Sequence, residues 1–109
     1  MQELDINEQS SLCLYVYGIV PLKNNAKTVK FEFAGMGEKP IRIIPYRDIA
    51  AAASYYPVLK PLVNETEAMR HAEIVKKIAE KATLIPMAFG NVFNDEATLK
   101  TVLGKAYNP

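Results

Sequence analysis

The chain has 109 residues with a formal net charge of +1, half of its residues are hydrophobic, and it contains a single cysteine. This composition suits one globular domain, gives no pull towards nucleic acid or an anionic membrane, and excludes both an internal disulfide and a cysteine-based metal cage. No early stretch resembles a signal peptide and no apolar run approaches the ~20 residues of a membrane span, so we expect a cytoplasmic protein.

The first half of the chain predicts a flexible arm followed by three strands. Residues 1–11 are polar and show little periodicity, so we expect them to form the arm. Leu12–Val20 is apolar on both faces, which is typical of a central strand. Thr28–Ala34 alternates apolar and charged residues like a half-buried strand, and Ile41–Tyr46 follows a glycine-containing turn as the third strand.

The next segment, Arg47–Tyr56, is compatible with either a helix or a strand. Its four alanines favour a helix by propensity alone, but the segment is short and Pro57 closes it. We favour a strand whose small side chains let a helix pack closely against it.

A helix is predicted over Asn64–Ala82, with Asn64 or Thr66 as its cap. Its apolar residues recur at helical spacing, which indicates one buried stripe. The stripe contains Ala68, Met69, Ala72, Val75, Ile78, Ala79 and Ala82.

Leu84–Glu96 is the least ordinary stretch, because it holds a proline and a glycine within an apolar run. A proline is tolerated in a strand at the edge of a sheet, so Pro86 predicts an edge strand, and Gly90 lets the chain bend where that strand ends. Alternation predicts four bulky residues on one face, beneath the helices. These residues are Ile85, Met87, Phe89 and Phe93.

The chain closes with a predicted helix over Asp95–Ala106, which Asn94 or Asp95 caps. Strands that are segregated from helices in this order indicate an α+β fold. We predict a ferredoxin-like arrangement, in which a largely antiparallel sheet carries two helices on one face and a hairpin replaces the first helix. Residues 12–109 would form this single domain.

The sequence contains no arrangement of residues that predicts catalysis. His71 is the only histidine and flanks the apolar stripe of its helix, where packing explains it better than the role of a base without a partner. Cys13 lies within an apolar strand and is interpreted as a small core residue. No cofactor motif or metal-ligand spacing occurs, so we expect no enzyme, no cofactor and no metal site.

If both helices cover one face of the sheet, the other face is open and carries Tyr15 and Tyr17. An exposed apolar face is typical of a docking site. The same tyrosines, in LYVYGI, also resemble the aromatic strand motif of RNA-recognition domains. An RNA-binding or small-molecule-binding module is therefore the alternative function, although no second basic-aromatic motif follows and we expect no nucleic-acid partner.

Four blocks of the sequence follow one another in a recognisable order: LYVYGIVP, IPYRDIAAAASYY, RHAEIVKKI and LIPMAFGNVFNDE. They occur in the order seen in the gas vesicle protein F/L (GvpF/GvpL) family, and the chain resembles the N-terminal domain of that family. The resemblance implies a ferredoxin-like fold and a non-enzymatic accessory protein of gas vesicles. Such a protein would bind the hydrophobic shell protein, assist gas vesicle assembly with other accessory proteins, and lie at the inner surface of the shell.

The resemblance also defines where this chain departs from its relatives. Many relatives carry an arginine where this chain has Ala88, so an ion pair made by that arginine is not expected here. Relatives are longer, with a helical C-terminal domain that we expect to be absent. The partner contacts that we predict are Tyr15, Tyr17, Arg47 and Asp48. The residues that the resemblance marks as a structural family motif are His71, Pro86, Phe89 and Gly90.

Overall fold

The computed structural model describes residues 12–22, 30–57 and 64–107. The predicted arm, residues 1–11, lies outside the described residues, as do Thr28 and Val29 of the second predicted strand. The strands are β1 (Leu12–Pro21), β2 (Arg42–Tyr46), β3 (Ile49–Pro57), β4 (Ile85–Pro86) and β5 (Val92–Phe93). The helices are the short 3₁₀ turn η2 (Met36–Glu38), α2 (Glu65–Lys81) and α3 (Glu96–Tyr107).

The strands form one antiparallel sheet in the order β2-β3-β1-β4. The short strand β5 also pairs with β1, at Leu14 and Tyr15, whereas β4 pairs with Gly18 and Ile19. The predicted α+β class is confirmed, and the strand order fits the ferredoxin-like arrangement. The predicted positions of the first strand in the centre and of Pro86 at an edge are also confirmed.

The alanine-rich segment is a strand, as predicted against its helical propensity. Residues 50–53 of β3 are fully buried and lie between β2 and β1. Burial on both faces and ladders on both sides outweigh propensity differences of a few tenths of a kcal/mol per residue. The caps are also where the sequence predicts them: Asn64 accepts from the N–H groups of Thr66 and Glu67, and Asp95 accepts from that of Thr98.

The second predicted strand is wrong in its described part, because residues 30–34 are irregular. The segment crosses one face of the sheet and does not join an edge. Phe31 and Phe33 pack there against the same cluster as α2, and the chain then turns through η2. The alternation of apolar and charged residues therefore reflects burial of Phe31 and Phe33 on one side of the segment. A segment can bury one side in this way without forming the hydrogen bonds of a strand.

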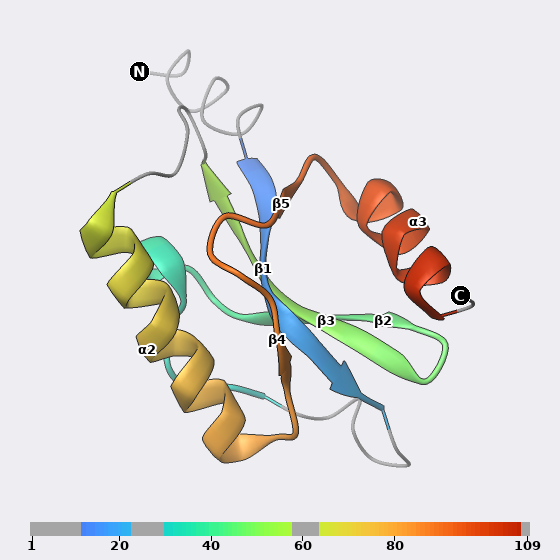
Figure 1. Cartoon of the computed structure of the whole chain (residues 1–109), viewed down its shortest axis with the longest axis horizontal. Helices are drawn as coiled ribbons and strands as arrows, with labels where there is room; N and C mark the ends of the chain where they lie inside the picture. The colour runs from blue at the N-terminus through green and yellow to red at the C-terminus, as the bar shows by residue number, and fades with distance from the viewer. Residues whose placement is uncertain (1–11, 23–29, 58–63, 108–109) are drawn as a thin grey trace.

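The two helices lie on opposite faces of the sheet, and the prediction of both on one face is wrong. Ile74 and Ile78 of α2 pack with Tyr15 and Tyr17, whereas α3 packs with the alternate residues of β1, including Leu14. Figure 1 shows α2 and α3 on either side of the strands. The cause is that residues 30–41 occupy the space beside α2, and that β1 and β3 are apolar on both faces and need cover on both.

The buried stripe of α2 is also rotated from the predicted one. The buried residues are His71, Ile74 and Ile78, whereas Met69 is 66% exposed. Alanines contributed most of the predicted stripe, but an alanine side chain buries little area, so the larger residues decide the orientation. His71 can enter the core because both of its ring nitrogens find partners there.

The four bulky residues after α2 do not share one face, contrary to the prediction. Met87 and Phe93 pack against the cluster under α3, whereas Phe89 packs against the cluster under α2 and Ile85 is 66% exposed. The alternation is broken because the chain turns between β4 and β5, where Gly90 has a φ of 96°.

Candidate functional site

Tyr15 and Tyr17 are fully buried, so the prediction that they lie on an open sheet face is wrong. They point to the side of β1 that α2 and residues 30–41 cover. Their rings lie 5.2 Å apart, and Tyr56, His71 and Phe89 surround Tyr15 at centroid distances of 5.5–6.5 Å. A partner could reach these tyrosines only if the segments that cover them moved away from the sheet.

His71 ties three parts of the fold together. Its Nε2–H donates to the carbonyl oxygen of Met87 at 2.9 Å, because a carbonyl can only accept. In the neutral ring Nδ1 is then the acceptor, and the Tyr15 hydroxyl donates to it at 2.7 Å. Burial lowers the pKa of His71, although its bond to Met87 opposes the shift. His71 therefore joins α2 to β1 and to the chain that follows β4.

This burial predicts an acid-sensitive fold. The pKa of His71 in the folded chain lies below its ordinary value of 6.5, so between the two values the unfolded chain binds more protons. The contribution of neutral His71 to stability is complete above pH 6.5 and is lost as the pH falls through the folded-state pKa. We expect urea midpoints to fall on acidification in this window, and to fall less steeply for His71→Asn; equal slopes for the two proteins would contradict the prediction.

A second polar chain runs from Tyr17. The backbone N–H of Met36 donates to the Tyr17 hydroxyl, which donates to Ser54 Oγ, and Ser54 donates to the carbonyl of Pro40, each at 2.8 Å. Burial raises the pKa of Tyr17, so the hydroxyl stays protonated and can make both bonds. These bonds fasten the irregular segment to the sheet without leaving a buried polar side chain unpaired among the described residues.

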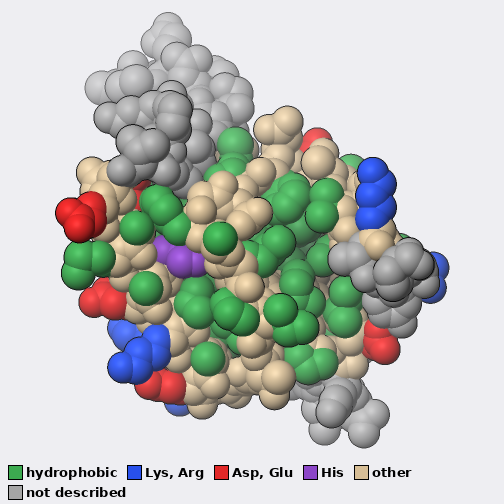
Figure 2. Space-filling view, in the orientation of Figure 1, with side chains coloured by type: hydrophobic (Ala, Val, Ile, Leu, Met, Phe, Trp, Pro, Cys, Tyr) green, Lys and Arg blue, Asp and Glu red, His purple; other side chains and the backbone are tan. Residues whose placement is uncertain are grey.

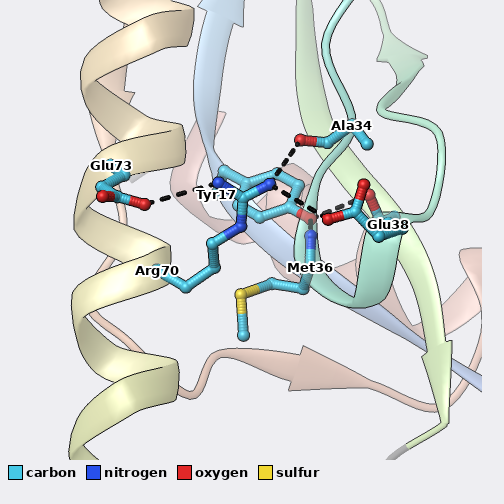
Figure 3. Close-up of polar contacts among 7 residues, drawn as sticks. Tyr17, Ala34, Met36, Glu38, Arg70 and Glu73 are labelled. Atoms are coloured by element: carbon cyan, nitrogen blue, oxygen red, sulfur yellow. Dashed lines mark hydrogen bonds and ion pairs between the residues drawn. The ribbon is translucent and has the colours of Figure 1, made fainter.

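Arg70 adds a third link to the same segment (Figure 3). Its guanidinium donates to the carbonyl of Ala34 at 3.4 Å and lies 3.7 Å from the Glu38 carboxylate and 3.4 Å from that of Glu73. The carboxylates are largely exposed, so each pair contributes little, about 0–1 kcal/mol. The polar cluster under α2 is thus a structural connection between helix, segment and sheet.

The remaining predicted residues lie apart from this cluster or at its border. Arg47 and Asp48 form the exposed tip of the β2–β3 hairpin, so the structure does not bring them together with Tyr15 and Tyr17. Phe89 lies against His71 with ring centroids 5.9 Å apart, and Ala88 is exposed beside it. Partner contact by Arg47 and Asp48 stays a prediction.

Within residues 12–22, 30–57 and 64–107, no group of His, Cys, Asp and Glu side chains could hold a metal ion. In the same part of the chain, no helix is both long and apolar enough to span a membrane.

A surface that the sequence analysis missed lies on the α3 face of the sheet. Ile19, Ile49 and Met87 are only partly buried there, and Ile85 pairs with Ile19 across the ladder and is 66% exposed. We call these four residues the apolar surface. Figure 2 shows hydrophobic side chains gathered over the region of β4, between α2 and α3, with acidic and basic side chains towards the periphery.

This surface is exposed because α3 covers only part of its face. The contacts of α3 concentrate on β2 and β5, and Leu99 and Leu103 fill the core there. The two-residue spacing of Ile85, in β4, and Met87, directly after it, is a signal in the sequence. With both helices expected on one face, this signal predicts core residues instead of a surface.

Residues 13–108 match the protein family described as gas vesicle synthesis protein GvpL/GvpF. The chain is 26% identical over 94 residues to gas vesicle protein F1 of Halobacterium salinarum (strain ATCC 700922 / JCM 11081 / NRC-1), a match that covers 83% of this chain and 42% of that relative.

The fold is similar to crystal structures of the gas vesicle protein GvpF from two sources. For Anabaena sp. PCC7120 the TM-score is 0.70 at 24% identity, over 89% of this chain and 39% of that one. For Microcystis aeruginosa the TM-score is 0.69 at 23% identity, over 87% and 39%. This chain therefore spans about two fifths of the length of these relatives.

Proposed function

Because this chain belongs to the gas vesicle synthesis protein GvpL/GvpF family, we propose that it binds the hydrophobic shell protein of gas vesicles and assists assembly of the shell. The role is non-enzymatic and is carried out at the inner surface of the shell, together with other gas vesicle accessory proteins. The observation that carries the proposal is the apolar surface, which gives a hydrophobic partner a place to bury area on a folded domain.

The energetics support such a contact. Burying an exposed isoleucine side chain stabilises a complex by about 1.5–3 kcal/mol, and Ile85 has two thirds of its surface available. The alternative of an RNA-binding module has lost its basis, since it required exposed aromatic side chains and Tyr15 and Tyr17 are buried.

A matched pair of variants tests the proposal. Ile85→Gln is expected to weaken binding to the purified shell protein about tenfold, which corresponds to about 1.4 kcal/mol. Met69→Gln is the control, because Met69 is also 66% exposed but lies on α2, away from the apolar surface. Affinity is measured by pull-down at graded concentrations of shell protein, with unfolding curves to show that both variants are folded.

Equal affinities of the two variants and the parent would exclude the apolar surface as the binding site. Absence of binding by the parent chain would contradict the proposed function for this domain. In that case binding of the shell protein by a longer relative is the comparison to make, because the relatives are more than twice as long as the part that matches this chain.

A further inference from the structure

Among the described residues, the two outermost strands of the sheet each contain a proline. β2 lies at one edge with Pro45, β4 lies at the other with Pro86, and both prolines are exposed. Proline has no N–H group, so a neighbouring strand loses a hydrogen bond wherever the proline nitrogen faces it.

At the β4 edge the nitrogen of Pro86, which carries no hydrogen, faces away from the sheet. The N–H of Met87 donates to the carbonyl of Tyr17 at 2.9 Å, so Met87 turns its backbone polar groups towards β1. Successive residues of a strand turn these groups to opposite sides, and Pro86, opposite Gly18, therefore faces outward. β4 has only two residues, and the chain turns away at Gly90.

The short β5 strand adds little to this edge. The N–H of Val16 donates to the carbonyl of Asn91 at 3.0 Å, so Asn91 faces β1 and Val92 is the residue that faces outward. The two-residue length of β5 leaves a neighbouring chain no continuous row of donors and acceptors.

At the β2 edge the hairpin register leads to the same arrangement. The two-residue loop makes Tyr46 and Ile49 the closing pair, which exchanges hydrogen bonds within the hairpin. By alternation, Pro45 and Ile43 face away from β3. Of these two outward positions, only Ile43 offers an N–H group.

We infer that both outer edges of this sheet are closed to strand addition, so that neither a second copy of the chain nor an extended partner segment joins the sheet. Prolines and very short strands are established means of blocking edge-to-edge pairing. The consequence for the partner rests on the proposed function: the shell protein is held against the apolar surface, face-on, and adds no strand.

Proline replacement tests the state of the edges in the purified chain. Pro45→Val restores an outward donor on a five-residue strand, and its mass by light scattering is expected to double with rising concentration as two β2 edges pair about a two-fold axis. Pro86→Val alone is expected to keep the mass of the parent, because β4 and β5 have two residues each and offer no continuous row of donors and acceptors even when the donor at position 86 is restored. Pro40→Val is the control, because Pro40 is exposed but lies outside the strands.

Pro45→Thr provides a second folded variant with the same restored donor, and circular dichroism verifies the fold of each. Folded Pro45→Val and Pro45→Thr that both keep the mass of the parent would overturn the inference, as would intermolecular sheet formed by the parent itself. These measurements need no shell protein, so their failure is distinct from failure of the proposed function.

The mode of binding has its own test at concentrations below self-association. Pro45→Val is expected to bind the shell protein with the affinity of the parent, because face-on contact does not use the β2 edge. A severalfold gain in affinity would show that the partner adds a strand only once the β2 edge is opened, which supports a closed edge in the parent. A severalfold loss would show that the parent's β2 edge takes part in binding and would overturn the inference. Absence of binding by the parent would contradict the proposed function, while the mass measurements would still decide the state of the edges.

Discussion

Leu99→Ala is expected to lower the free energy of unfolding by about 2–5 kcal/mol, a large part of the 5–15 kcal/mol that is typical of a single domain. Leu99 is fully buried and packs with Leu14 and Val16 on the face of the sheet opposite α2. The substitution therefore leaves a cavity between α3 and the sheet. Urea unfolding followed by circular dichroism measures the change.

Val102→Ala is the matched control on the same helix. Val102 is 38% exposed, so its truncation is expected to cost less than about 1 kcal/mol. A small effect of both substitutions would mean that α3 does not pack on the sheet, and would contradict the placement of the two helices on opposite faces.

Gly18→Ala is expected to lower the free energy of unfolding by about 3 kcal/mol, at the upper end of overpacking effects. A Cβ atom at this position would lie 2.5 Å from the carbonyl oxygen of Ile85 and 2.6 Å from the side chain of Leu84. The first contact is with backbone, so β4 must move away from β1 to relieve it. Thermal or urea unfolding gives the magnitude.

The damage is expected to be local to this edge of the sheet. In Gly18→Ala the N–H of Met87, which donates to Tyr17, should lose protection from hydrogen exchange, while the β2–β3 ladder keeps its protection. Gly104→Ala is the control, since its Cβ would meet only the far end of the Tyr46 side chain and no backbone atom, and alanine is favoured within a helix. Equal losses in the two variants would contradict the close approach of β1 and β4.

The same local geometry connects the family motif to the apolar surface. His71 and Gly18 together determine where the chain after α2 runs, because one bonds to Met87 and the other lets β4 approach β1. Met87 and Ile85 of that chain then form half of the apolar surface. Under the proposed function, variants at these supporting positions should weaken binding to the shell protein only as far as they displace β4.

Features with strong local signals could be predicted from the sequence. The caps Asn64 and Asp95 and the helices that follow them depend on side chains that bond to nearby backbone groups. The central position of β1 follows from apolar residues on both faces, and the edge position of β4 follows from the missing N–H of Pro86. In each case the relevant interaction is local or depends on one residue type.

The candidate site could not be predicted, because it depends on which face each layer covers. The same alternation in β1 is compatible with Tyr15 and Tyr17 exposed or buried, and only the position of α2 decides between them. Likewise, Ile85 and Met87 have the pattern of core residues, but α3 lies over β2 and β5 and leaves them partly uncovered.

The sequence by itself therefore determined the two helices and their caps, the central position of β1 and the edge position of Pro86. Only the tertiary structure decided that α2 and α3 lie on opposite faces, that residues 30–34 cross the sheet without joining it, and that the tyrosines are core. The physical reason is that a local pattern of apolar residues shows which side of a strand or helix is buried, but not which other element covers it. That element is decided by which segments already occupy the space on each face of the sheet.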